Sequence, residues 1–225
     1  MKKSNNQLWE TVHASRRWGE YPPEDVVRFV ANTYGSVPKK ARGNISMLDM
    51  GCGQGAASWF LAREGFAVTG VDVSPSAIAK SQEYLAKDSL KAVFHVADFK
   101  ALTLPAGSFD CIFDIESIYT NVATDIKKIY SDVYTFLKPG GSFFAMAFST
   151  DCSNFGTGTK LEEHTYTDIP SGSPSTGVAH YFDREELETL LKSVGFTEIE
   201  INQKIVTRNN GRDSISQWIV YGSKK

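Results

Sequence analysis

Three glycines early in the chain have the spacing of a ligand-binding turn. Gly51, Gly53 and Gly55 follow the apolar residues 45–50 and precede a stretch with helical periodicity. Glycines between a strand and a helix let the backbone turn tightly and bring its N–H groups to a ligand at the helix N-terminus. Asp72 ends the next apolar stretch about 20 residues later, where a carboxylate can bind ribose hydroxyls. This spacing favours a nucleoside-containing ligand over a plain turn followed by a surface acid.

Two further carboxylates could complete such a site. Asp49 lies just before the first glycine in an otherwise apolar strand, and a buried carboxylate needs a cationic or hydrogen-bonding partner. Asp98 precedes Phe99 after a third apolar stretch, and this pair suits the amine and the face of a purine. Both acids, like Asp72, lie where predicted strands end, at the edge where open α/β sheets bind ligands. No Lys or Arg lies in the glycine loop to face a pyrophosphate.

The segments that position these residues alternate between strand-like and helix-like patterns, which is typical of a parallel α/β sheet. Strands are predicted at residues 45–50, 66–73, 92–97, 111–115, 142–148, 196–206 and 214–222. Helices are predicted at about residues 22–34, 56–64, 75–90, 125–137 and 183–194. The last two strands have no helix between them, so they should pair as a hairpin and make one edge of the sheet antiparallel.

Length and charge restrict the class of protein. The chain has 225 residues with 24 Lys and Arg against 26 Asp and Glu, so its net charge is −2. The missing basic excess disfavours nucleic acid as the main partner. No apolar run reaches the roughly 18 to 20 residues of a membrane span, and the N-terminus lacks an apolar signal core. We therefore expect a soluble, cytoplasmic protein with no membrane segment.

One main domain with two additions is expected. Residues 1–44 carry scattered aromatic side chains and are predicted to form an N-terminal helical cap. Residues 45–225 form the predicted main domain. Within it, residues 150–178 are rich in Gly, Ser and Thr, and so long a stretch in a compact domain is more often a functional lid than filler. The cap and this lid-like insertion are expected to fold over the ligand-binding edge.

In their order along the chain, these motifs resemble the class I S-adenosylmethionine-dependent methyltransferases. The resemblance is carried by LDMGCGQG at residues 48–55, GVDVS at 70–74, ADF at 97–99, FDCIFD at 109–114 and LKPGG at 137–141. It implies that residues 45–225 are a methyltransferase domain with a Rossmann-like three-layer α/β sandwich. It also implies a seven-stranded, mostly parallel sheet with an antiparallel last strand. The implied cofactor is S-adenosylmethionine, with S-adenosylhomocysteine as product.

The resemblance further implies which residues hold the cofactor. They are Asp49, Gly51, Gly53 and Gly55 at its methionine end, Asp72 and Val73 at the ribose, Ala97, Asp98 and Phe99 at the adenine, and Asp114 and Ile115 near the sulfonium. Phe99 could equally be a core residue. Tyr21 is a further candidate for the sulfonium, because an aromatic face suits a cation; a plain hydrophobic contact explains it equally well.

The acceptor is expected to be a small molecule that is methylated on N or O. Relatives that act on nucleic acids or protein amides carry an Asn/Asp-Pro-Pro-aromatic segment where this chain has DIES at residues 114–117. An amine needs only to arrive deprotonated, whereas a hydroxyl gains from a general base of near-neutral pKa. The catalytic candidates are His180, His164 and Glu116, with His13, Tyr21 and Tyr119 as further polar groups. Packing or capping explains His180 as well, and an exposed acidic turn explains His164.

Alternatives from other classes remain open. An NAD-dependent oxidoreductase could use the same glycine loop, although the missing pyrophosphate partner and the long segment before the first strand disfavour it. A noncatalytic nucleoside-binding module would keep the fold as a scaffold, although its glycine loop and acids should then be eroded. A metal-dependent mechanism through Asp151 and Asn154 is disfavoured, and no metal site is expected. The sequence is compatible with a monomer or a homodimer.

Overall fold

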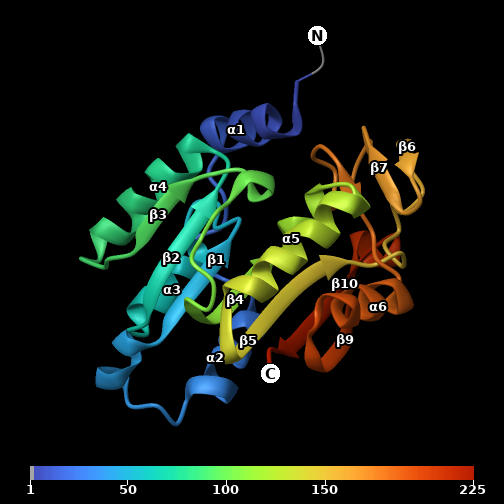
Figure 1. The fold of residues 1–225 in the computed structure, drawn as a ribbon. Coiled ribbons are helices and arrows are strands. Elements are labelled where there is room, and N and C mark those ends of the chain that lie inside the picture. Colours follow the sequence, from blue (N-terminus) through green and yellow to red (C-terminus); the bar gives the residue numbers. More distant parts are fainter. Residues whose placement is uncertain (1–2) are drawn as a thin grey trace.

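Apolar runs that end in glycine or polar turns form one central sheet. The computed structural model describes residues 3–225, and its main sheet has the strand order β3-β2-β1-β4-β5-β10-β9 (Figure 1). The strands are β1 (Ser46–Met50), β2 (Ala67–Asp72), β3 (Val93–Val96), β4 (Phe109–Ile115), β5 (Leu137–Phe148), β9 (Thr197–Arg208) and β10 (Asp213–Ser223). Strands β1 to β5 pair in parallel, and β10 pairs antiparallel with both β5 and β9. The predicted seven-stranded sheet with an antiparallel last strand is confirmed.

Helices cover both faces of this sheet, as its continuous apolar strands require. Along β4, Ile112 packs into a core shared with α5 and α6, whereas Cys111 and Phe113 pack on the opposite face with α2 and α3. The helices are α1 (Asn5–Ser15), α2 (Glu24–Tyr34), α3 (Ala56–Arg63), α4 (Pro75–Lys87), α5 (Ala123–Phe136) and α6 (Arg184–Val194). Short 3₁₀ turns occur at Lys39–Asn44, Phe99–Ala101, Ile118–Thr120 and Asn209–Gly211.

The two N-terminal helices occupy different places, which corrects the picture of one helical cap over the binding edge. Helix α2 buries Val26, Phe29 and Val30 against the sheet. The Phe29 ring lies 5.6 Å from the Phe113 ring and 5.1 Å from the Phe144 ring. Helix α1, which the sequence pattern did not predict, lies instead beyond the strand ends, near the top of the view in Figure 1. Only the segment around α1 is therefore placed to cover a site at that edge.

Helix α1 is attached to the turn that follows β2. The Glu10 carboxylate accepts hydrogen bonds from the hydroxyl groups of Ser74 and Ser76 and from the backbone N–H of Ser76. Ser74 is the N-cap of α4, so Glu10 places a negative charge at the positive end of that helix. In return, Lys80 of α4 donates to the backbone carbonyl of His13 at the other end of α1.

The insertion is more ordered than the predicted loop. It contains β6 (Thr159–Glu162) and β7 (Thr165–Thr167), which form a three-stranded antiparallel sheet with β8 (Ala179–His180). The Asn154 side chain fixes the segment between β7 and β8, because its amide donates to the carbonyls of Ser171 and Pro174. In Figure 1 this sheet lies to one side of the molecule, beside α5 and α6.

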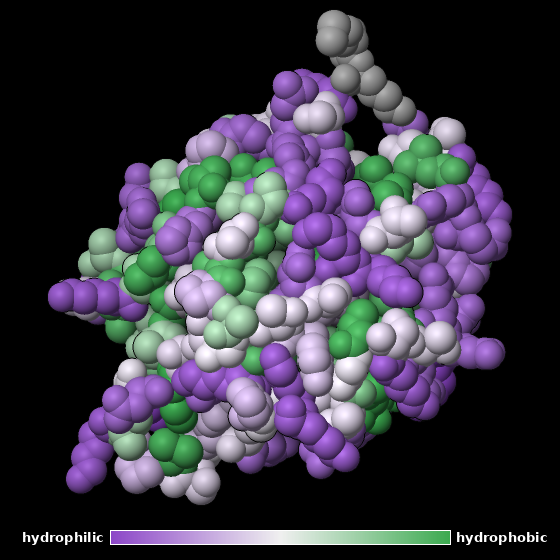
Figure 2. Space-filling model, in the orientation of Figure 1, coloured by the Kyte–Doolittle hydropathy of each residue, from purple (hydrophilic) through white to green (hydrophobic). Residues whose placement is uncertain are grey.

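The surface shows no single dominant apolar face in the view of Figure 2, where small apolar groups are scattered among hydrophilic residues. Within residues 3–225, no helix combines the length and apolar character that crossing a membrane requires.

Truncating the buried face of α2 should destabilise the whole domain. We expect Phe29→Ala to lower the free energy of unfolding by about 3–5 kcal/mol, because the lost ring leaves a cavity between α2 and the sheet. Val27→Ala, on the exposed face of the same helix, is the control and should change it by less than about 0.5 kcal/mol. Urea denaturation measures both. Equal changes in the free energy of unfolding for the two variants would show that the packing of α2 on the sheet does not stabilise the domain.

Candidate functional site

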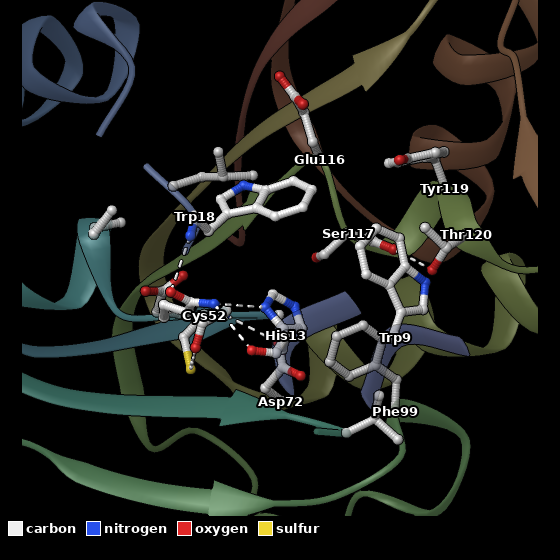
Figure 3. Close-up of a pocket in the computed structure, with 18 of the residues that line it drawn as sticks. Trp9, His13, Trp18, Cys52, Asp72, Phe99, Glu116, Ser117, Tyr119 and Thr120 are labelled. Carbon is white, nitrogen blue, oxygen red and sulfur yellow. Dashed lines mark hydrogen bonds between the residues drawn. The ribbon is translucent and has the colours of Figure 1, made fainter. Parts of the chain in front are cut away.

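A cavity of about 290 Å³ opens at the carboxyl ends of β1, β2 and β4 (Figure 3). The crevice beyond the carboxyl ends of parallel strands is where open α/β sheets bind ligands. One wall comes from the strand ends and the turns that follow them. The opposite wall comes from α1 and the segment between α1 and α2, including Trp9, His13, Trp18 and Tyr21. No residue of the insertion lines this cavity, so within the described chain the insertion does not serve as its lid.

The turn after β1 can exist only with glycine at its first position. Gly51 has φ +72°, and a Cβ built on it would lie 2.2 Å from the Cβ of Ser117 in the turn after β4. This close approach brings the ends of the two strands together around the cavity. Gly55 has φ +89° and starts α3, but it lies behind the cavity wall, next to Ser81.

Asp72 is held in place by the glycine turn. Its Oδ2 accepts from the backbone N–H of Gly53 at 2.9 Å, and its Oδ1 accepts from that of Ser74 at 2.9 Å. Burial raises the pKa of Asp72, although these hydrogen bonds oppose the shift. Its neighbour Val73 also lines the cavity. The carboxylate is thus aimed into the cavity by fixed donors and keeps lone pairs free for further hydroxyl groups.

Asp49 is a buried carboxylate with few partners. It is only 2% exposed, lines the cavity, and accepts a hydrogen bond from the Ser58 hydroxyl to Oδ2 at 2.6 Å; the backbone N–H of Ser58 also donates to it. Burial raises its pKa to about 6, and the nearby carboxylates of Asp72 and Asp114 add to the shift. A cationic group in the cavity would remove this cost, because an opposite charge stabilises the ionised carboxylate.

Asp98 and Phe99 also line the cavity, as the third strand end predicts. The Asp98 carboxylate already accepts from the Asn6 side chain of α1 at 2.8 Å and from the backbone N–H of Lys100 at 2.9 Å. Phe99 approaches the glycine turn, with its Cζ 3.3 Å from the Cβ position of Gly51. Helix α1 therefore touches the same acid that would face a purine.

Some predicted residues lie at the rim or behind the wall. Ile115 lines the cavity, whereas Ala97 and Asp114 do not. Asp114 is buried, and its Oδ1 accepts from the hydroxyl and backbone N–H of Ser117 and from the backbone N–H of Ile118, so it shapes the turn after β4. Tyr21 lies at the rim with 73% of its surface exposed, edge-on to the Trp59 ring at 5.9 Å.

The structure separates two of the three catalytic candidates from the cavity, which corrects that interpretation. The Glu186 carboxylate bridges His164, at 2.9 Å from Nδ1, and His180, at 3.0 Å from Nε2. The other ring nitrogen of His180 lies 2.7 Å from the Thr165 hydroxyl. Strand pairing between β7 and β8 buries His180 in this cluster, where it ties the insertion to α6. Of the three, only Glu116 lines the cavity.

The two residues of the metal-binding alternative make other contacts in the structure. Asp151 accepts from the Gln203 side chain, and Asn154 holds the insertion. His164, Asp183 and Glu186 bring potential ligand atoms within 4.8 Å of one another. Their hydrogen bonds to His180 and to the first turn of α6 account for that grouping.

The aromatic wall from the N-terminal segment was only partly anticipated. The rings of His13, Trp9 and Trp18 form a three-way cluster, in which the His13 centroid lies 5.9 Å from that of Trp9 and 5.6 Å from that of Trp18, and the two indole centroids lie 6.2 Å apart. Gln54 of the glycine loop fixes this segment, because its side chain donates to the carbonyl of Arg16 and accepts from the N–H of Trp18. Burial lowers the pKa of His13, against the pull of the nearby Asp72. The abundance of aromatics before residue 35 was the available signal.

Comparison with known proteins agrees with this geometry. Residues 47–141 match the family described as methyltransferase domain. The chain is 31% identical over 175 residues to a sterol 24-C-methyltransferase of Debaryomyces hansenii, covering 74% of this chain and 43% of that protein. It is 26% identical over 173 residues to a ubiquinone biosynthesis O-methyltransferase of Methylobacterium nodulans, covering 77% and 68%. The chain thus spans less than half of the first relative and about two thirds of the second.

A solved structure supports the fold independently. A SAM-dependent methyltransferase from Methanosarcina mazei superposes with a TM-score of 0.65 at 24% identity, covering 80% of this chain and 92% of that one. The matched domain contains β2 to β4 and the glycine turn, and the fold shared with the solved structure covers a larger part of the chain than this domain. The chain therefore contains a methyltransferase domain at residues 47–141, within a fold that it shares with a SAM-dependent methyltransferase.

Proposed function

We propose that this chain transfers a methyl group from S-adenosylmethionine to a nitrogen or oxygen atom of a small molecule. The observation that carries the proposal is the charge of the cavity. Its described lining holds the carboxylates Asp49, Asp72, Asp98 and Glu116 and no Lys or Arg. S-adenosylmethionine offers an ammonium and a sulfonium to such a site, together with ribose hydroxyls.

The same charge opposes the dinucleotide alternative. A pyrophosphate needs backbone N–H groups or cations at the glycine turn. Here the N–H of Gly53 already donates to Asp72, and the nearby carboxylates would repel two phosphates. An NAD-dependent activity is therefore the weaker candidate.

The donor set fits the cofactor group by group. Asp49 would hold the ammonium, because its buried carboxylate accepts only from Ser58 and has a raised pKa that a cation would lower. Asp72 would hold the ribose hydroxyls, and Asp98 with Phe99 would face the adenine. When bound, the cofactor supplies an electrophilic methyl group. The chain's own contribution is then to align the acceptor and to exclude water, for which α1, Trp9 and Trp18 close one side of the cavity.

A small acceptor is supported by the enclosure of the site. The cavity lies beneath α1 and between narrow turns, where a nucleic-acid or protein chain would have to displace the aromatic wall. The names of the sterol and ubiquinone relatives point to small molecules in those proteins. Neither name decides between nitrogen and oxygen for this chain.

Removing the Asp72 carboxylate should weaken binding of S-adenosylhomocysteine by at least about tenfold. The expected loss reflects one or two hydrogen bonds from ribose hydroxyls to a charged acceptor, worth about 1.5–3 kcal/mol each. Isothermal titration calorimetry of Asp72→Ala measures it. Asp183→Ala is the matched control, because Asp183 caps α6 far from the cavity by accepting from the N–H of Glu186. Similar affinities in the two variants would refute the site assignment.

Asp49→Asn should stabilise the free protein and weaken the ligand complex. The pKa of Asp49 in the folded chain, about 6, exceeds the unfolded value of about 3.9. The folded state therefore binds the extra proton, and the stability contributed by this group rises as the pH falls from above 6 towards 4. At pH 8 the variant should gain about 1–3 kcal/mol in free energy of unfolding and lose most of this pH dependence.

The binding half of this prediction has the opposite sign. In the wild-type protein, affinity for S-adenosylhomocysteine should fall as the pH drops below about 6, because the ammonium needs the ionised carboxylate. Urea denaturation and calorimetry at pH 5 and pH 8 measure both effects. Asp132→Asn, a partly exposed acid on α5, is the control. A variant that binds as tightly as the wild type at pH 8 would remove Asp49 from the site.

A further inference from the structure

We propose that the acceptor is an amine and that Glu116 recognises its ammonium group, which makes Glu116 the specificity-determining residue of the acceptor subsite. This inference rests on the proposed methyl transfer and names the substrate class of the same cavity. It is carried by the position of Glu116, by two polar atoms without partners, and by the absence of cations from the described lining.

Glu116 is the one lining carboxylate at the far side of the cavity from the cofactor acids. Asp49, Asp72 and Asp98 lie at the ends of β1, β2 and β3, whereas Glu116 follows β4. Figure 3 shows Asp72 and Phe99 on one side of the cavity and Glu116 with Tyr119 on the other. After the cofactor has used the first three acids, Glu116 remains to meet the second ligand.

The backbone holds Glu116 in an unusual conformation. Its φ is +54°, in the left-handed region that costs a non-glycine residue about 1–2 kcal/mol. Its backbone N–H donates to the carbonyl of Met146 on β5. Such strain concentrates at functional sites, where the surrounding structure maintains it.

Two polar atoms at this end of the cavity have no partner among the described residues. The Glu116 carboxylate accepts from Gln217 through Oε1 only. The hydroxyl of Tyr119, a side chain that is 5% exposed, makes no hydrogen bond within residues 3–225. Neither is a fully buried unpaired atom, because within residues 3–225 the indole N–H of Trp9 is the one such side-chain atom. Both oxygens belong to residues that line the cavity, so they are available to a ligand. An ammonium supplies donors for both, because Glu116 and Tyr119 can each accept.

Nearby cations do not neutralise Glu116. Lys204 and Arg208 of β9 lower its pKa, but burial is the larger influence and raises it. Lys204 is engaged with Asp25 of α2 at 2.5 Å, and Arg208 is exposed. Neither lines the cavity. An anionic acceptor such as a phosphate or carboxylate would therefore meet a negative wall without a counter-ion.

In the proposed methyl transfer, Glu116 accepts the proton that the amine loses. The ammonium gives a proton to the Glu116 carboxylate, and the freed lone pair of the nitrogen forms the bond to the methyl carbon. The carbon–sulfur bond breaks, and its electron pair returns to sulfur. A hydroxyl acceptor is the rival, because the same carboxylate could act as its general base.

Calorimetric titration of the full chain with isosteric probes tests the proposal. The probes are benzylamine and tryptamine, their neutral counterparts benzyl alcohol and tryptophol, and the anion phenylacetate, each with and without saturating S-adenosylhomocysteine. At least one amine should bind at least tenfold tighter than its alcohol, and phenylacetate should not bind. Glu116→Gln should abolish the amine preference and leave S-adenosylhomocysteine affinity within about twofold, which also shows that the variant is folded.

Glu163→Gln is the control, because Glu163 is an acid of the insertion with a side chain that is 77% exposed, and it should keep the preference. Equal binding of amines and alcohols, binding of no amine, or an amine preference that survives Glu116→Gln would overturn the proposal. Failure of S-adenosylhomocysteine to bind would instead overturn the proposed function. The titrations without it would then still decide whether the subsite selects amines.

Discussion

The site depends on the parallel, in-register pairing of β1 between β2 and β4. Met50 lies opposite Val71 on one side and opposite Asp114 on the other. Because the three strands point the same way, their polar ends meet at one edge, and the turns that follow them face one cavity. The near contact between Gly51 and Ser117 shows how little space separates two of these turns. A larger residue at position 51 would force β1 and β4 apart and with them the two halves of the site.

This arrangement concentrates negative charge in a place that disfavours it. Asp49 and Asp72 line the cavity, and burial raises the pKa of each. A fold selected for stability alone would place apolar residues there, as it does elsewhere on both faces of the sheet. The carboxylates persist at the strand ends because a cationic, hydroxyl-rich ligand can repay their desolvation. Glu116 is a further carboxylate in this cavity, and it marks the acceptor end, whereas Asp49 and Asp72 mark the cofactor end.

The sheet and the cofactor edge could be predicted because they rest on local signals. The glycine spacing, the acids at strand ends and the apolar periodicity are all visible within short windows. Helix α1 was missed because His13 is its one buried side chain, so it has no apolar stripe, and its position depends on contacts with residues about 64 positions away. His164 and His180 were misplaced for a related reason. Their environment is created by the pairing of two very short strands, β7 and β8, and by Glu186 from α6, which no local pattern reveals.

The attachment of α1 has a consequence for the timing of a reaction cycle. Glu10 bonds to Ser74 and Ser76, directly beyond the acid proposed to hold the ribose. Moving α1 away from the cavity would break these bonds and leave the N-terminus of α4 without its carboxylate. A carboxylate at the positive end of a helix contributes about 0.3–1 kcal/mol, so the closed form is favoured before any ligand contributes. Departure of a spent ligand is then coupled to the loss of this charge from the N-terminus of α4, although Ser74 remains its N-cap. The residence time is therefore a property of α4 as well as of the ligand itself.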